Sequence, residues 1–308
     1  MNKKNIILDT DIGGDCDDVL ALAYLLQAHN KEMCNLIGIT YGSFSARSPE
    51  CIRAICRQYG HDDDIPVGIL KDYPEEYKDN DGVYAGAVAE AFPVPELVYE
   101  TAVNLMRKLL AKIKKTEKVT IVAIGPLPNI SALLNSQADE ISPLDGISLV
   151  KEKVKEFAVM GCDFSHENGI NPTNKDNTPV AEWNIRCDVE ASKTLVLKSP
   201  VPIVFLPFEA GNNMITGAAM VKRDGRTKPA SLSYIIHGSS NGRHSWDPAT
   251  ALYAVNGAEP WFTLTPPGDV YIDDKGVSSF IERDGGLHFY LKCKLPQAEI
   301  AKEIDDMV

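Results

Sequence analysis

The chain has 308 residues, 44% of them hydrophobic, and its 43 acidic residues against 31 basic ones give a net charge of −12. A chain of this length can bury roughly three quarters of its unfolded surface around one large core or two modest ones. The acidity argues against a nucleic-acid backbone or an anionic membrane surface as the main partner.

The cysteines and the N-terminal residues indicate the cellular compartment. The seven cysteines are scattered without a Cys-x-x-Cys pair, which is typical of reduced thiols and of neither a disulfide framework nor a zinc site. The first four residues lead directly into a strand-like run and lack the apolar region of a signal peptide. No apolar run approaches the roughly 18 residues of a membrane helix. We therefore expect a soluble cytoplasmic protein.

An acidic turn near the N-terminus lies between the first two predicted elements. A buried strand is expected over 5–8, and an apolar run typical of a helix begins at Val19. Between them the chain carries five aspartates: Asp9, Asp11, Asp15, Asp17 and Asp18. So many like charges repel one another unless a cation or bound protons offset them. The turn therefore favours a hard cation held by oxygen ligands.

Strand and helix patterns then alternate, as in α/β folds with a mainly parallel sheet. Further strands are expected over 34–40, 65–69, 119–124, 157–160 and 201–206. Helices are expected over 49–59, 97–115 and 187–197, with another starting near residue 130. The segment 161–179 is long and polar, and loops of that length inside a compact domain are usually functional or disordered.

The last third combines helices with short alternating segments. Helices are expected over 231–237, 248–255 and 297–307, and antiparallel edge strands over 270–272, 277–281 and 288–291. Because neither a linker nor an internal repeat interrupts the pattern, residues 1–308 are predicted to form one domain. Its expected fold is an open, mainly parallel α/β sheet flanked by helices, with a small antiparallel edge near the C-terminus. Sites in such sheets form beyond the carboxyl ends of the strands.

Other interpretations of the acidic turn fit less well. An EF-hand loop starting at Asp9 would have Gly14 at its sixth position but Leu20 instead of glutamate at its twelfth. A phosphoryl-transfer turn would need a hydroxyl or β-branched residue where Gly13 and Gly14 stand. Neither glycine-rich phosphate-binding motif occurs. Capping of the following helix would explain one aspartate and leave four.

Four segments in family order resemble the nucleoside hydrolase superfamily, and together they extend over most of the chain. They are Asp9–Leu22, Val119–Asn129, Ala181–Asn184 and Ser245–Ala251. The resemblance implies an open α/β core, a bound Ca²⁺, a small ribosyl substrate, and hydrolysis of the N-glycosidic bond of ribonucleosides. Members of the family are often dimers or tetramers, so it also implies a homo-oligomer.

The resemblance further implies roles for single residues. Asp11, Asp18 and Asp247 would bind Ca²⁺ through their carboxylates, and Ile124 through its backbone carbonyl. Asp17 would be the general base that takes a proton from a metal-bound water.

A second set would bind the substrate: Ser43, Met160, Asn177, Glu182, Trp183, Asn184 and Trp246. Glu182 and Asn184 would bind ribose hydroxyls, and Trp183 stands where the family commonly has phenylalanine. Asn177, or alternatively Asn174, would add a sugar contact, although the spacing to Glu182 is one residue short of the family pattern.

Asp15 is a departure from the family pattern. The turn reads D-x-D-x-G-x-D-x-D-D, two residues longer than the shorter D-x-D-x-G-x-D-D form. Asp15 could replace Asp17 as the base, bind the metal, or only form hydrogen bonds. We count it among the metal candidates, and we assign the family's paired aspartates to Asp17 and Asp18 because the apolar run follows them directly.

The leaving-group side differs as well. Trp246 precedes Asp247 at the position where well-studied members have a histidine that acts as the general acid. An indole cannot usefully donate a proton in that role. His244 is an alternative proton donor, and Ser43 stands where the family often has Gly-Asn. Four aromatic side chains could stack on a planar leaving group or, alternatively, pack in the core. They are Tyr84, Phe164, Trp183 and Trp246.

Two rival functions remain open. The first is hydrolysis of another ribosyl compound, with Trp246 marking a different leaving group. The second is a Ca²⁺-dependent sugar- or nucleoside-binding protein without catalytic activity.

Overall fold

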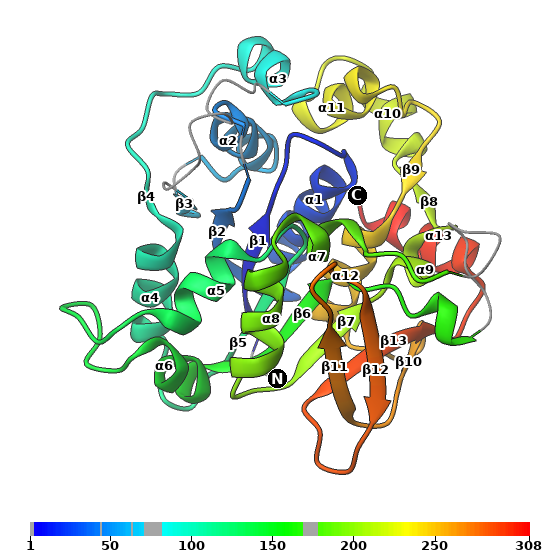
Figure 1. Ribbon diagram of the computed structural model, residues 1–308. Coiled ribbons are helices and arrows are strands. Elements are labelled where there is room, and N and C mark those ends of the chain that lie inside the picture. The colour runs from blue at the N-terminus through cyan, green and yellow to red at the C-terminus, as the bar shows by residue number, and fades with distance from the viewer. Residues whose placement is uncertain (1–2, 44, 63, 71–81, 169–177) are drawn as a thin grey trace.

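The fold is built on one long sheet, shown as a ribbon in Figure 1. This computed structural model describes residues 3–43, 45–62, 64–70, 82–168 and 178–308. The strands follow the order β12-β11-β13-β7-β6-β5-β1-β2-β3-β4, and β10 also pairs with β13. Their bounds are β1 Lys4–Thr10, β2 Cys34–Tyr41, β3 Val67–Ile69, β4 Glu100–Thr101, β5 Val119–Ala123, β6 Val154–Met160, β7 Ile203–Leu206, β10 Phe262–Leu264, β11 Gly268–Ile272, β12 Ser278–Glu282 and β13 His288–Cys293.

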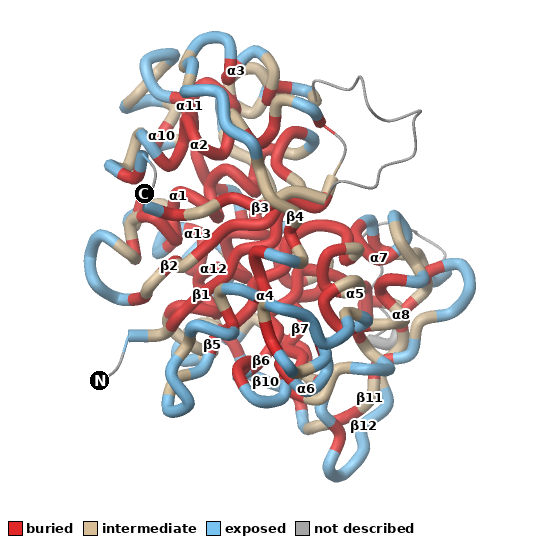
Figure 2. The backbone as a smooth tube through the Cα atoms, turned by 90° about the vertical axis from the view of Figure 1, so that its left-hand side faces the viewer, coloured by how far each residue is buried: buried red, intermediate tan, exposed pale blue. Residues whose placement is uncertain are grey.

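The central strands are parallel and apolar on both faces, because helices cover both faces of the sheet. In β1, Ile6 and Leu8 belong to one core while Ile7 belongs to the other, as the two-residue period of a strand requires. Figure 2 shows this interior as buried backbone surrounded by exposed loops.

One core contains residues from a large group of helices: α1 Asp17–Asn30, α2 Ser48–Gln58, α3 Ala85–Ala91, α9 Phe208–Gly211, α10 Ala218–Asp224, α11 Pro229–His237, α12 Trp246–Asn256 and α13 Gln297–Met307. The other core contains residues from α4 Ala102–Lys112, α5 Pro128–Asn135, α6 Gly146–Lys153, α7 Trp183–Cys187 and α8 Val189–Lys198. The 3-10 turn η2 Ser165–Asn168 follows β6, and a separate two-stranded antiparallel sheet pairs β8 Ile215–Thr216 with β9 Arg243–His244.

The predicted α/β class and mainly parallel sheet are confirmed, but several details were wrong. The helix expected from residue 97 begins at Ala102, because Thr101 is its N-cap and accepts a hydrogen bond from the Asn104 amide at 3.3 Å. Val98, which lies within the expected helix but before its actual start, is 98% exposed. The helix expected over 187–197 is divided at Asp188, whose side chain caps α8. Helix α6 had no counterpart in the prediction.

The C-terminal edge is only partly antiparallel. Strands β10, β11 and β12 are antiparallel to their neighbours, whereas β13 runs parallel to β7. The expected antiparallel edge is confirmed, since β13 pairs antiparallel with β10 and β11. Its parallel pairing with β7 was not predicted, because an alternating pattern does not specify direction. All seven cysteines are free. Among the described residues, no helix is long and apolar enough to cross a bilayer.

Candidate active site

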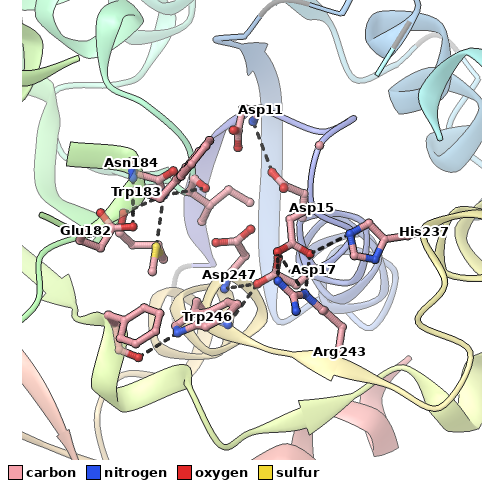
Figure 3. A pocket seen from close by; sticks show the side chains of 15 residues that line it. Asp11, Asp15, Asp17, Glu182, Trp183, Asn184, His237, Arg243, Trp246 and Asp247 are labelled. Atoms are coloured by element: carbon pink, nitrogen blue, oxygen red, sulfur yellow. Dashed lines mark hydrogen bonds and ion pairs between the residues drawn. The ribbon is translucent and has the colours of Figure 1, made fainter. Parts of the chain in front are cut away.

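A pocket of about 450 Å³ opens beyond the carboxyl ends of the central strands (Figure 3). The turn after β1, the residue after β5, the end of β6 and the first turns of α7 and α12 all contribute to it. The lining residues are Asp11, Gly14, Asp15, Asp17, Asp18, Ile124, Met160, Glu182, Trp183, Asn184, Phe208, His237, Arg243, Trp246 and Asp247. The structure thus brings most of the predicted site residues together.

Three buried carboxylates form the centre of the pocket. Each of Asp17, Asp18 and Asp247 offers an oxygen, and these atoms lie within 4.8 Å of one another. Oδ2 of Asp17 accepts hydrogen bonds from the backbone amides of Trp246 at 3.1 Å and Asp247 at 3.2 Å, in the first turn of α12. Oδ1 of Asp18 accepts one from the Thr10 hydroxyl at 2.5 Å. The carboxylates are therefore fixed in place before any ligand binds.

Asp11 also lies beside this group, in close contact with the glycine that follows β5. The backbone amide of Asp11 donates to Oδ1 of Asp18 at 3.3 Å. A Cβ atom at Gly125 would lie 2.6 Å from Oδ1 of Asp11, so only glycine allows this carboxylate its position. Ile124, just before Gly125, also lines the pocket. The predicted metal ligands Asp11, Ile124, Asp18 and Asp247 thus all line the pocket.

The electrostatics of this group fit a bound cation. Burial, reinforced by the neighbouring carboxylates, raises the pKa of Asp17, Asp18 and Asp247 well above the ordinary range. Burial also raises the pKa of Asp11 to about 7. Such a group must hold protons or a cation at neutral pH. Carboxylate oxygens together with a backbone carbonyl are the donors that Ca²⁺ prefers, so the residues present fit that ion.

Asp9 supports the turn from behind and does not line the pocket. It is buried at the end of β1 and accepts hydrogen bonds from the Thr40 hydroxyl at 2.6 Å and the Asn129 amide nitrogen at 2.8 Å. Burial raises its pKa to about 7, although both hydrogen bonds oppose that change.

Asp15 has a different environment from the three clustered carboxylates. Nε of Arg243 lies 2.8 Å from Oδ1 of Asp15, and Nη2 of Arg243 donates to Oδ2. Nε2 of His237 is 3.7 Å from Oδ1. Burial alone would raise the pKa of Asp15, but the hydrogen bonds and charge of Arg243 outweigh it and lower that pKa. Asp15 is therefore an ionised partner of Arg243.

Glu182 and Asn184 form the opposite side of the pocket. Glu182 caps α7, its Oε1 accepting from the Asn184 amide at 3.0 Å and its Oε2 from the Ile185 amide at 3.1 Å. Burial raises the pKa of Glu182 to about 7. The Asn184 side chain donates to the carbonyls of Ile124 and Met160, both at 3.3 Å. These hydrogen bonds connect this side of the pocket to the ends of β5 and β6.

The two tryptophans of the pocket differ in setting. Trp183 is 60% exposed, and the Arg186 guanidinium lies 4.4 Å from its ring centroid. Trp246 stacks on Phe208 with ring centroids 5.4 Å apart, and its indole N–H donates to the Phe208 carbonyl at 2.8 Å. The indole N–H is therefore already committed to the protein.

Four residues singled out from the sequence lie elsewhere. His244 is outside the pocket lining, and its Nδ1 contacts the Asn212 carbonyl. Ser43 is half-buried and also outside the lining. Tyr84 and Phe164 are fully buried and outside the lining, so of the two alternatives core packing holds for these rings. Asn174 and Asn177 lie outside the described residues.

Four lining residues were missed from the sequence: Gly14, Phe208, His237 and Arg243. Gly14 lies within the acidic turn, but no local motif marks the other three. Arg243 lies in the polar loop before Asp247, but its partner Asp15 is 228 residues away in the chain. Only the fold brings the two together.

Known proteins resemble this chain in sequence and in structure. The pyrimidine-specific ribonucleoside hydrolase RihA of Salmonella paratyphi B is 29% identical over 226 residues, 71% of this chain and 64% of that protein. The match thus covers slightly less than two thirds of that relative. A plant nucleoside hydrolase, PpNRh1, has a TM-score of 0.71 at 18% identity and 99% coverage of both chains.

The inosine-uridine preferring nucleoside hydrolase of Bacillus anthracis gives a TM-score of 0.69 at 18% identity, covering 99% of this chain and 100% of that one. These two likenesses show that the fold is shared. The sequence profile described as "Inosine-uridine preferring nucleoside hydrolase" matches residues 6–307, nearly the whole chain. The chain therefore belongs to the inosine-uridine preferring nucleoside hydrolase family.

Proposed function

We propose that this protein is a Ca²⁺-dependent hydrolase of the N-glycosidic bond of ribonucleosides. The observation that carries the proposal is the pocket of about 450 Å³, which is lined by five aspartates and by Glu182 and Asn184. That volume suits a small ligand. The family match supports the reaction class, and the donor set supports the ion.

The ion would be held by Asp11, Asp18, Asp247 and the Ile124 carbonyl. An ion held there would supply positive charge that attracts ribose hydroxyls and lowers the pKa of a bound water. Asp15 is left out of the ligand set because Arg243 already occupies both of its oxygens.

Asp17 is our proposed general base, which takes a proton from the attacking water. Its Oδ2 is occupied by two backbone amides, and this leaves Oδ1 for the water. Asp15, the alternative base suggested by the sequence, is instead paired with Arg243 through both of its oxygens.

The remaining residues bind the sugar and stabilise the transition state. Glu182 and Asn184 would bind ribose hydroxyls, while Met160, Trp183 and Trp246 would form the walls. Cleavage of a glycosidic bond develops positive charge on the ribose ring, and the nearby carboxylates stabilise that charge. We also expect a homo-oligomer, which size-exclusion chromatography with light scattering would test.

A panel of ribonucleosides supplied with Ca²⁺ tests the function through release of base and ribose. We expect turnover of at least one nucleoside by the native protein. Asp17→Asn should lose turnover by about 10³-fold or more while still binding the same nucleoside. If Asp17→Asn keeps the turnover of the native protein, Asp17 is not the base.

The same panel separates the rival functions. Binding of a nucleoside without turnover by native protein would replace the proposal with a binding function. Turnover of other ribosyl compounds but of no nucleoside would favour a different leaving group at Trp246.

A further inference from the structure

One side of the pocket carries two basic side chains that the proposed chemistry does not use. Arg243 and His237 both line the pocket beside Asp15 (Figure 3). Asp15 pairs with Arg243 through Nε and Nη2, and it lies 3.7 Å from Nε2 of His237. Pairing of this two-point kind fixes the plane of a guanidinium as well as its position.

Both partners of the ion pair are themselves anchored. Arg243 belongs to β9, opposite Thr216 of β8, and its carbonyl accepts a hydrogen bond from the Ser245 hydroxyl at 3.0 Å. The Asp15 carbonyl accepts one from the Tyr84 hydroxyl at 2.7 Å. Because neither backbone is free to drift, the guanidinium occupies a defined place on the pocket wall.

Arg243 keeps a donor available in that place. Its bonds to Asp15 use Nε and Nη2, and within the described part of the chain Nη1 has no hydrogen-bond partner. The side chain is 30% exposed, and the guanidinium lies 5.4 Å from the Trp246 ring centroid. A planar group lying against Trp246 would therefore have a charged donor beside it.

The arrangement of the pocket indicates which part of the substrate would lie against Trp246. Glu182 and Asn184 lie on one side of Asp247, and Arg243 and His237 lie on the other. A ribose that spans Glu182 and the carboxylate cluster leaves the side with Trp246 and Arg243 for the substituent on its anomeric carbon.

We propose that Arg243 binds the leaving base and stabilises the negative charge that the base acquires. The inference rests on the proposed function and deepens it. The water oxygen bonds to C1′ and its proton passes to a carboxylate. The C1′–N bond breaks, and its electron pair goes to the base nitrogen and is shared with a conjugated carbonyl oxygen. Nη1–H of Arg243 donates to that oxygen, and the anion later takes a proton from solvent.

Arg243 does not act as an acid here, because a guanidinium does not release its proton in proteins. It therefore favours a class of substrate, namely nucleosides whose base carries a carbonyl conjugated with the glycosidic nitrogen. Asp15 is the positioning residue that holds Arg243 in place. This gives the additional aspartate of the acidic turn a role outside the metal site.

The test compares two ribosides that differ in how much help the leaving group needs. Uridine releases a poorly stabilised anion, whereas p-nitrophenyl β-D-ribofuranoside releases a stable phenolate. For Arg243→Ala, kcat/KM on uridine should fall on the order of 10²- to 10³-fold, and on the p-nitrophenyl riboside by about tenfold or less. Arg243→Lys should recover part of the loss on uridine.

Arg283→Ala is the matched control, because Arg283 makes the same two-point pair with Asp269 on the surface, away from the pocket lining. Its kinetics should equal those of the native protein. Asp15→Asn should reproduce the selective loss on uridine, mainly in kcat, and Asp15→Glu should restore part of it. A thermal melt of each variant checks that the fold is intact.

An equal loss on both substrates, or an unchanged rate on uridine, would overturn the role of Arg243. Turnover of the p-nitrophenyl riboside but of no nucleoside by the native protein would also overturn it, while leaving riboside hydrolysis intact. Turnover of neither substrate class would instead refute the proposed function, and the inference would fall with it.

Discussion

Asp15 and Asp17 are two residues apart in one acidic turn, yet their surroundings give them opposite properties. Asp15 faces Arg243, and its pKa is lowered despite burial. Asp17 faces other carboxylates in a buried position, and its pKa is raised well above the ordinary range. Sequence spacing could not separate the two roles, because each depends on a partner supplied by the segment 243–247.

Gly125 provides a residue-scale prediction about metal binding. Its Cβ, if present, would lie 2.6 Å from Oδ1 of Asp11, so Gly125→Ala should displace that carboxylate. We expect the calcium affinity to fall by about 10- to 100-fold, as for other residues that orient metal ligands. Isothermal titration of chelator-treated protein with Ca²⁺ measures it.

Gly14→Ala is the control for this substitution, because nothing lies within 4 Å of a Cβ built at Gly14. It should bind Ca²⁺ as the native protein does. An unchanged affinity in Gly125→Ala would show that Asp11 is not a ligand.

At the scale of elements, the site depends on how helices begin. The first turn of α12 directs two amides at Asp17, and the cap of α7 is Glu182 itself. One carboxylate therefore both starts a helix and lines the pocket. Its cap fixes Asn184, whose side chain reaches the ends of β5 and β6.

Comparison of two helix caps tests this double role. Glu182 caps α7 and Asp188 caps α8, but only Glu182 lines the pocket. Each change to alanine should cost about 0.5–2 kcal/mol of unfolding free energy, measured by chemical denaturation. Only Glu182→Ala should also lower kcat/KM for a nucleoside, by about 100-fold, given the contacts that it would lose to the sugar. Equal kinetics in both variants would remove Glu182 from the binding site.

The helices and strands also show which parts of the fold could be predicted from the sequence. The strand over 119–124 and the helix over 297–307 are formed nearly as predicted, because their apolar patterns are local. The start of α4 was misplaced because Leu97 and Val98 extend the helical pattern beyond the capping residue Thr101. The direction of β13 depends on β7, which is distant in the chain.

The residues of the candidate site likewise include some that the sequence could predict and some that it could not. Aspartates and an Asn that follow strand ends could be found from motifs, since the carboxyl ends of parallel strands meet at one edge. Arg243 and His237 could not, because a single basic residue outside any motif gives no sign of which distant segment it will face. For Tyr84 and Phe164 both alternatives stayed open, because an aromatic residue near a site looks the same in sequence whether it faces the pocket or the core.

For the whole molecule, the concentration of buried carboxylates should make stability depend on pH. Burial raises the pKa of Asp9, Asp11 and Glu182 to about 7. Between about pH 4 and 7 the folded chain therefore holds protons that the unfolded chain releases, so stability falls as pH rises through that window. After chelation, Tm should be lower at pH 8 than at pH 5 by about 5 °C or more.

Calcium should reverse this loss, because an ion that binds only the folded chain stabilises it. Adding Ca²⁺ at pH 8 should raise Tm toward its value at pH 5. A Tm that is equal at both pH values after chelation would mean that these carboxyl groups are not buried as described.

The account as a whole claims that one carboxylate cluster holds Ca²⁺ and serves the cleavage of a nucleoside. The most direct test is to follow ribose release from uridine while Ca²⁺ is titrated into chelator-treated protein. The account predicts no release without the ion and full recovery at one Ca²⁺ per chain. Release that is unaffected by chelation would contradict it.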